Sequence, residues 1–272
     1  GYLSEFTRNG FTVIDGSDAE DYVNKSGAEY VAWCWKAGGN KNTFNVDDVG
    51  YATAAAAGLN AGSIAVTGAS VGTKQGFSII KYTGTGTAGT ISHGLLEQPK
   101  FVVIKDLKNA NAWAVQHVGS VLGTGLLKFD GNDKDDTVAS AVWNSTAPTS
   151  SVFSVGTSGD VNYTTNSAEY IAYLWHDVPG LQKFGTYIGN QNANGPYVEL
   201  GFRPKLVWIK SITTNQNWYI HDSERSKFNP TKLDLRVNEG REQTTTTRFD
   251  FLSNGFKIRG ANLDMNDSGE TF

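Results

Sequence analysis

The stretch SAEYIAYLWHD, at Ser167–Asp177, has a near copy 140 residues earlier, GAEYVAWCWKA at Gly27–Ala37. In both copies apolar side chains occupy both alternating sets of positions, which is typical of a β-strand covered on its two faces. A third copy, SGETF at Ser268–Phe272, begins the same phrase. We expect this phrase to form the closing strand of a domain that the chain contains more than once.

Two further pairs of segments recur at a second, constant spacing. QPKFVVIKD at Gln98–Asp106 matches RPKLVWIKS at Arg203–Ser211, and NAWAVQH at Asn111–His117 matches QNWYIHD at Gln216–Asp222. In each pair the second segment starts 105 residues after the first. A constant offset over separated segments indicates an internal repeat.

The repeat predicts how the chain is divided. FTRNGFTV at Phe6–Val13 resembles FLSNGFKI at Phe251–Ile258, so residues 1–36 are expected to be the C-terminal half of a first copy. Residues 76–180 would form a complete copy, and residues 181–272 the next copy, truncated before its last strand. We therefore expect the chain to be part of a longer polypeptide.

Residues 37–75 match nothing at the other junction and are rich in Gly, Ala, Ser and Thr. The run ATAAAAGL, residues 52–59, is compatible with a short helix. Two interpretations remain open: a connector or inserted arm that packs on a neighbouring chain, and a plain loop between domains. Some ordered packing is expected, because structureless loops of this length are uncommon within compact units.

The repeated segments also predict the fold class. PKFVVIKD and PKLVWIKS are short, rich in β-branched and aromatic residues, and begin with a proline, which fits the first residue of a strand. Gly-Asn, Asn-Gly and Ser-Gly turn signals separate such segments, which favours a sandwich or barrel. We predict an all-β fold made of tandem β-sandwich, jelly-roll-like units of about 100 residues each.

The composition excludes several classes of protein. With 39% hydrophobic and 18% charged residues, the 272-residue chain is too apolar to be disordered, and its net charge of −4 gives no basic face for nucleic acid. No apolar run approaches the ~20 residues of a membrane span. Cys34 is the single cysteine, which excludes an intrachain disulfide and Cys-based zinc sites. Neither nucleic acid nor a membrane is an expected partner.

Aromatic side chains that occur in only one copy are the candidate binding residues. Trp113 and Trp218 recur in register, as do Trp35 and Trp175, which is expected of core packing. Aromatics without such a counterpart are expected to be exposed and to stack on the sugar rings of a host glycan; they are Trp143, Tyr163, Tyr197 and Phe228.

The acidic run DGNDKDDT, at Asp130–Thr137, is the candidate metal site. Its carboxylates could supply the hard oxygen ligands that Ca²⁺ prefers; they belong to Asp130, Asp133, Asp135 and Asp136. Lys134, however, takes a ligand position of the EF-hand pattern, and no Glu closes the loop. A solvated acidic loop is the favoured interpretation, calcium is the alternative, and no other cofactor is expected.

Catalytic signatures are weak. No G-x-S-x-G motif in a strand–turn–helix setting is expected to supply a serine nucleophile, and no histidine pair has the H-E-x-x-H spacing of a metalloprotease. We therefore expect a protein that is not an enzyme.

The phrases NVDDVGYATAAAAGL, QPKFVVIKD and LSNGFKIRG resemble a tandem repeat domain of unknown function from virion and tail-fibre-like proteins of marine tailed phages. The likeness covers nearly the whole chain. It includes an HGL turn at His93–Leu95, the strand Pro99–Lys105 and an Asn217–Trp218 pair, whereas the second copy has Glu199–Gly201 where HGL would stand. The resemblance implies a virion-surface or tail-fibre context and no catalytic residues.

The expected function is a structural and adhesion module of a phage virion appendage, located at the virion surface and outside the cell. Its expected partners are further copies of itself, with a trimer favoured, other virion proteins and host surface glycan. Three alternatives remain open: a capsid decoration protein, a bacterial surface adhesin of prophage descent, and a polysaccharide-degrading tailspike with two carboxylates about 5–10 Å apart.

Overall fold

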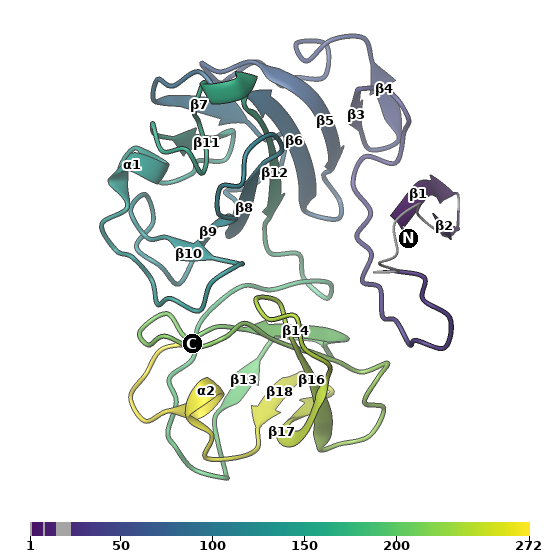
Figure 1. The fold of residues 1–272 in the computed structure, drawn as a ribbon, viewed down its shortest axis with the longest axis vertical. Helices are drawn as coiled ribbons and strands as arrows, with labels where there is room; N and C mark the ends of the chain where they lie inside the picture. The colour runs from purple at the N-terminus through teal and green to yellow at the C-terminus, as the bar shows by residue number, and fades with distance from the viewer. Residues whose placement is uncertain (1, 8, 15–22) are drawn as a thin grey trace. The chain divides into compact units, whose positions relative to one another are not determined.

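The computed structural model describes residues 2–7, 9–14 and 23–272 (Figure 1). The chain falls into two compact units, Gly1–Trp35 and Lys36–Phe272. Residues 1, 8 and 15–22, which belong to the first copy expected at 1–36, lie outside the described residues.

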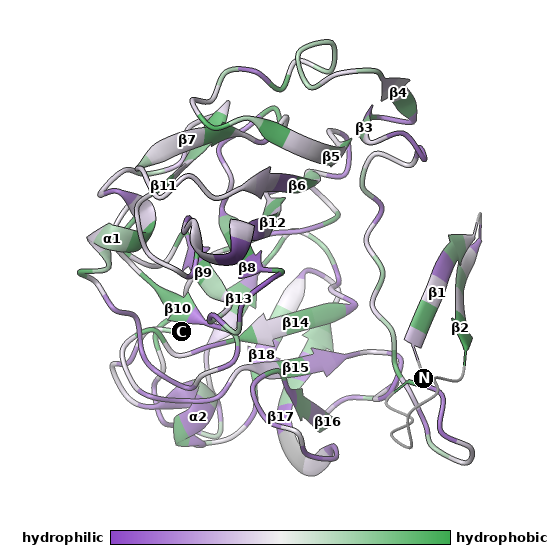
Figure 2. Cartoon of the chain, turned by 45° about the horizontal axis from the view of Figure 1, so that its top comes forward, coloured by the Kyte–Doolittle hydropathy of each residue, from purple (hydrophilic) through white to green (hydrophobic). Residues whose placement is uncertain are grey.

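The first unit contains a single β-hairpin among its described residues. β1 (Tyr2–Thr7) pairs antiparallel with β2 (Gly10–Ile14) and places Phe6 opposite Phe11. Hydrophilic and hydrophobic residues follow one another along β1 (Figure 2). Residues 27–37, the early copy of the strand phrase, form no strand, so that expectation is wrong for them. A strand exists only where a neighbouring strand takes up its backbone hydrogen bonds, and sequence alone does not supply that neighbour.

The second unit is mostly β-sheet, which confirms the all-β class. Among the described residues, helix is confined to α1 (Ser140–Trp143), α2 (Leu263–Asn266) and the 3₁₀ segment η1 (Thr165–Ser167). None of the described helices is long and apolar enough to cross a membrane. The run ATAAAAGL forms turns and not the expected short helix. Within it Gly58 has a φ of +74°, a left-handed conformation that glycine adopts at little cost.

An eight-stranded sheet dominates the first lobe, which we define as residues 36–177. Its strand order is β10-β9-β8-β12-β6-β5-β3-β4, and its neighbours are antiparallel except for the parallel pair β3 and β5. The strands are β3 (Phe44–Val46), β4 (Val49–Tyr51), β5 (Val66–Gly72), β6 (Phe77–Thr83), β8 (Phe101–Asp106), β9 (Ala114–His117), β10 (Leu127–Lys128) and β12 (Glu169–Trp175). Residues 37–75 thus supply β3, β4 and β5 at one edge of this sheet.

The strand predicted from EYIAYLW is confirmed as β12, which lies between β6 and β8. Its side chains Tyr170, Ala172 and Leu174 are fully buried, while Ile171 and Tyr173 are half-buried on the opposite face. The buried face packs against a two-stranded sheet of β7 (Gly89–Ser92) and β11 (Val152–Val155) in one hydrophobic core. Because both faces of β12 are covered, its apolar residues do not alternate with polar ones.

A six-stranded antiparallel sheet forms the second lobe, residues 178–272. Its order is β13-β18-β17-β16-β15-β14, and β14 is the last strand at its end. The strands are β13 (Tyr197–Glu199), β14 (Leu206–Ile209), β15 (Tyr219–Asp222), β16 (Thr231–Arg236), β17 (Thr244–Leu252) and β18 (Gly255–Ile258). Phe249, Phe251 and Phe256 form the centre of a separate hydrophobic core in this lobe.

Each lobe contains one aromatic pair that stacks with the same geometry as the pair in the other lobe. Tyr82 stacks on Tyr170 with ring centroids 5.3 Å apart, and Tyr187 stacks on Phe272 at the same 5.3 Å. The β8–β9 pair and the β14–β15 pair also share one register, since each aligned residue of the second pair lies 105 positions after its counterpart in the first.

A buried asparagine holds the loops of each lobe in the same way. The Asn162 amide donates to Gly156 O at 2.8 Å and its Oδ1 accepts the Thr85 N–H at 2.7 Å. In the second lobe the Asn266 amide donates to Gly260 O at 2.8 Å, and its Oδ1 accepts a backbone N–H at 2.8 Å. Both asparagines are fully buried.

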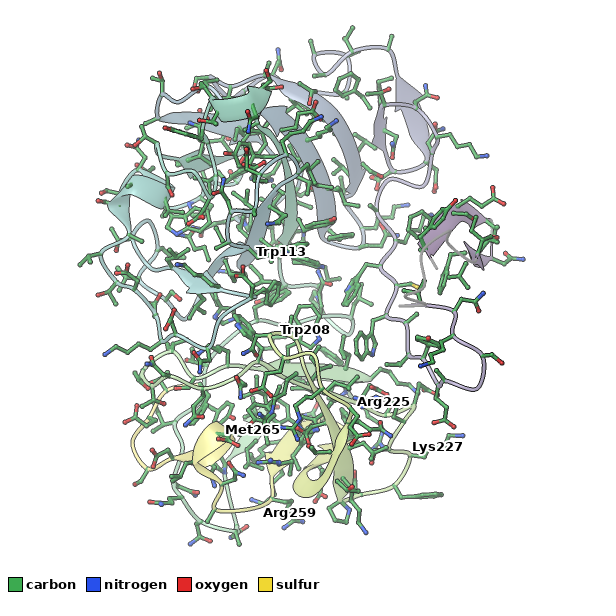
Figure 3. All side chains as sticks on the ribbon, viewed as in Figure 1. Trp113, Trp208, Arg225, Lys227, Arg259 and Met265 are labelled. Carbon is green, nitrogen blue, oxygen red and sulfur yellow. The ribbon has the colours of Figure 1, made fainter. Side chains whose placement is uncertain are left out.

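Aromatic residues join the two lobes within the second unit. Phe101 stacks on Phe184 at 5.6 Å, and Phe129 meets Trp218 edge to face at 4.7 Å. The Trp218 indole N–H donates to Lys128 O at 2.8 Å. Trp113 and Trp208 lie at the same junction (Figure 3). Trp218 and Trp175 are thus buried and Trp113 packs against their cluster, as expected of recurring tryptophans, whereas core packing is wrong for Trp35, which is 40% exposed.

Candidate functional site

The four aromatic residues predicted to bind a partner do not form one surface feature. Trp143 is only 1% exposed, because α1 directs it into the core of the first lobe, so its expected exposure is wrong. Tyr163 and Tyr197 are about half exposed and belong to different lobes. Phe228 is 84% exposed and stands in the loop before β16, which makes it the strongest of the four.

The predicted calcium ligands do not converge on one point. The Asp130 carboxylate accepts the Trp113 N–H at 3.3 Å, and the Asp136 carboxylate accepts the Val138 N–H at 3.1 Å. Asp135 is 8% exposed, and burial raises its pKa. Within the described residues, no three His, Cys, Asp or Glu side chains are placed to hold a metal ion together. The acidic loop caps backbone groups instead.

Lys210 is a buried charge that the sequence did not reveal. It is 5% exposed, and its Nζ donates to Asn132 O at 3.3 Å and to Ser211 O at 2.8 Å. Burial lowers the pKa of Lys210 to about 8, against the opposing attraction of Asp133 and Asp135. Because its donors are used to tie the two lobes together, the arrangement indicates a structural lysine.

The run GASVG at Gly68–Gly72 does have the G-x-S-x-G spacing, so the expectation that the motif is absent is wrong, but its setting is different. It lies inside β5, whereas the motif requires a sharp turn between a strand and a helix. The Ser70 hydroxyl donates to Asn45 Oδ1 at 2.8 Å and accepts the Gly38 N–H at 2.9 Å. No histidine is among these partners, so the serine holds a loop.

A shallow pocket in the second lobe brings together side chains of complementary chemistry. It has a volume of about 360 Å³ and is lined by Asn229, Pro230, Asp250 and Arg259. Phe228 directly precedes Asn229 in the chain, and we call this hollow the Phe228 pocket. Its members come from the loop before β16, from β17 and from the residue that follows β18.

Local hydrogen bonds fix the pocket's two sides. The Asn229 side chain accepts the Phe251 N–H at 2.9 Å and donates to Phe251 O at 2.8 Å, so it pairs with β17 as a strand would. The Asn229–Pro230 peptide bond is cis. On the other side, Arg259 Nε donates to Asp250 Oδ2 at 2.6 Å. The pocket is therefore organised before any ligand arrives.

One cationic side chain lines the Phe228 pocket, and another is exposed on the chain segment that leads into it. The Asp250 side chain is 8% exposed and is neutralised by Arg259, whose side chain remains 43% exposed. Lys227 is exposed beside Phe228, and Figure 3 shows Lys227 and Arg259 at the periphery of the second lobe. The Arg259 guanidinium thus lines the pocket, and Lys227 and Phe228 are exposed on the chain segment that leads into Asn229.

A second hollow, of about 250 Å³, lies beside β3, β5 and β6 and includes Asn45, Ser70 and Lys81. Its polar groups already have partners. The Asn45 amide donates to Ala69 O at 3.2 Å, and Lys81 Nζ pairs with the Glu169 carboxylate at 2.6 Å. It offers fewer groups to a ligand than the Phe228 pocket does.

The sequence-based comparisons place the chain in one family. A family model described as DUF7483, a domain of unknown function, matches residues 1–272, so the chain belongs to this family. Comparisons with curated proteins and with solved structures give no significant match.

Proposed function

We propose that this DUF7483 domain is a structural and adhesion module of a phage virion appendage, such as a tail fibre, and that it is not an enzyme. We further propose that it works outside the cell and binds host surface glycan through the Phe228 pocket. The virion context rests on the sequence phrases that resemble tail-fibre-like proteins. The binding role rests on the pocket, and the observation that carries it is the 84% exposure of Phe228, which directly precedes the pocket residue Asn229 in the chain.

We also propose that the two lobes are tandem copies of one β-sandwich-like unit of about 100 residues. The shared stacking geometry, the shared hairpin register and the matching asparagine networks support this. A block that can be copied in tandem is suited to an extended appendage, because its length grows without a new fold.

The chemistry of the Phe228 pocket fits a sugar better than an apolar ligand. An exposed aromatic face can stack on a pyranose ring, while amide, carboxylate and guanidinium groups exchange hydrogen bonds with hydroxyls. Asp250 and Arg259 neutralise one another, and Lys227 adds a positive charge to the exposed segment that leads into the pocket. A sugar that carries a carboxylate should therefore bind best, because Arg and Lys form charge-assisted hydrogen bonds with it.

Binding of acidic and neutral polysaccharides from the host envelope tests the proposal. Phe228→Ala and Arg259→Ala should each weaken binding about tenfold, the effect of losing one good contact of about 1.4 kcal/mol. Leu96→Ala removes another exposed apolar side chain, 72% exposed, from the first lobe and is the matched control. Equal binding by all variants would contradict the site, and release of reducing ends from the polysaccharide would contradict the non-enzymatic role.

A further inference from the structure

The face of the eight-stranded sheet that is turned away from the core of the first lobe carries a group of lysines. β12 lies between β6 and β8 (Figure 1), and its Ile171 lies opposite Lys81 of β6 and opposite Lys105 of β8. Residues that lie opposite one another in antiparallel strands share a face, so these three side chains are neighbours. We call this surface, together with Glu169, Tyr173 and Lys108, the Ile171 face.

The side chains of the Ile171 face are accessible to a ligand. Ile171 and Tyr173 are half-buried, and the side chains of Lys81 and Lys108 are 45% and 49% exposed. On the β6 side the face continues into the hollow of about 250 Å³ that Ile79 and Lys81 help to line. An apolar centre with charged groups around it is typical of a surface that binds a partner.

Positive charge exceeds negative charge on this face. Lys81 Nζ lies 2.6 Å and Lys108 Nζ 3.8 Å from the Glu169 carboxylate, so two ammonium groups share one carboxylate. Lys105 Nζ donates to the carbonyl of Asn111, a neutral group. Three ammonium groups against one carboxylate leave a surplus of two positive charges, on a chain whose net charge is −4. Because an ammonium group has three donors, each lysine keeps donors for a further acceptor.

We propose that the Ile171 face binds an acidic polysaccharide that lies across β6, β12 and β8. Lys81 and Lys105 belong to the strands on either side of β12, so their Cα atoms are about 10 Å apart at the usual strand spacing. Acidic groups spaced along one polysaccharide chain can accept charge-assisted hydrogen bonds from both lysines. The sugar rings then pack on the apolar surface of Ile171 and Tyr173.

Two other acidic partners match this surface less well. A nucleic acid carries a phosphate about every 3.4 Å along each strand, a charge density that three lysines on a chain of net charge −4 do not balance. An extended acidic peptide gains affinity by pairing with an open sheet edge, whereas β6, β12 and β8 each lie between two paired strands. A polysaccharide requires neither dense positive charge nor a free edge, so it is the occupant that the surface favours.

The Ile171 face lies in the first lobe and the Phe228 pocket in the second, so binding at one does not require the other. The two share only the class of ligand that the proposed function names. Binding at the Ile171 face goes beyond that function, because it needs neither the Phe228 pocket nor a virion.

Titration of the whole chain with polygalacturonate, and with its neutral methyl ester, tests the proposal. Phe228→Ala serves as the background, so that the Phe228 pocket adds little to the measured affinity. Polygalacturonate should bind at low salt, and Lys81→Gln and Lys108→Gln should each weaken binding about tenfold, since each removes one charge-assisted contact. The methyl ester lacks the carboxylates and should bind weakly to every variant. Equal affinities for the acid and its ester, or no binding of either, would overturn the proposal.

Glu169→Gln should have the opposite effect to the lysine variants. It removes the carboxylate that two lysines share and should tighten polygalacturonate binding about threefold. Lys74→Gln and Lys232→Gln each remove one charge from an exposed position outside the face and should leave the affinity nearly unchanged. Equal losses for these control lysines, or no gain from Glu169→Gln, would contradict the Ile171 face.

Comparison with the wild-type background separates this face from the Phe228 pocket. Binding that depends on Lys81 and Lys108 but not on Phe228 would support the Ile171 face and contradict the pocket. Binding that depends on Phe228 alone would support the pocket and contradict the face. Single-stranded DNA that binds as tightly as polygalacturonate at the same salt concentration would overturn the assignment to a polysaccharide.

Discussion

Phe272 stacks on Tyr187 with ring centroids 5.3 Å apart and ring planes 15° apart. Phe272 is 5% exposed and exchanges two backbone hydrogen bonds of 3.0 Å with Tyr187. Phe272→Ala should therefore lower the free energy of unfolding of the second lobe by about 3 kcal/mol, the usual cost of deleting a core Phe. Urea denaturation followed by tryptophan fluorescence measures this. A loss below about 0.5 kcal/mol, typical of a surface change, would show that the contact is not part of the core.

The buried asparagines make a paired prediction for the two lobes. Asn162→Ala and Asn266→Ala each leave buried backbone groups without partners, so each should cost about 3 kcal/mol. Asn132→Ala, at an exposed position, is the control and should change little. Thermal unfolding of the three variants provides the comparison. A large loss in only one lobe would contradict the equivalence of their networks.

Gly94 is required by the turn that follows β7. Its φ is +71°, and a Cβ there would meet Leu59 at 2.8 Å and Val71 at 3.0 Å in the core. Gly94→Ala should cost about 3 kcal/mol, from left-handed backbone strain together with overpacking. Gly180→Ala is the matched control, since Gly180 also has a positive φ, +78°, but open space around it. That change should cost only about 1 kcal/mol. Equal losses in urea denaturation would refute the packing argument.

Buried histidines predict that the fold loses stability in mild acid. Burial lowers the pKa of His93 to about 4, while the hydrogen bond to Thr149 O opposes the shift. Because the unfolded pKa is near 6.5, the unfolded chain binds the proton first as the pH falls. The stabilisation is complete above pH 6.5 and is lost between pH 6.5 and 4, by about 1.4 kcal/mol per pH unit. His221, whose pKa burial lowers to about 3, adds a similar slope.

His93→Asn provides the measurement. Asn keeps an acceptor toward the Leu95 N–H, which His93 Nδ1 now accepts at 3.1 Å, but cannot be protonated in this range. The variant should be less stable at pH 7, and its free energy of unfolding should fall less steeply from pH 6.5 to 5. Parallel pH profiles for the variant and the wild-type chain would mean that His93 does not carry the effect.

Much of the fold follows from local sequence. The proline-led segments become β8 and β14, and EYIAYLW becomes β12, because β-branched and aromatic residues buried on two faces favour strands wherever partners exist. The early copy at residues 27–37 has the same composition and forms no strand. Partner strands are supplied by distant parts of the chain, and single-sequence patterns do not reveal them.

The candidate site also depends on contacts between distant parts of the chain that the sequence does not reveal. Phe228 could be found from the sequence because no counterpart occupies its position in the other copy, yet the same rule selected Trp143, which α1 buries. The pairing of Asp250 with Arg259 depends on the meeting of β17 with the end of β18. The Asn-Pro dipeptide beside Phe228 was the available signal, since it marks a turn that can present a side chain to solvent.

The central proposal, that this chain belongs to a phage virion appendage, is tested most directly with gold-tagged antibody raised against residues 76–180 and applied to intact phage virions. The account predicts gold at the tail tip or along fibres, where an adhesion module meets the host. Gold spread over the head, or virions without label, would contradict it.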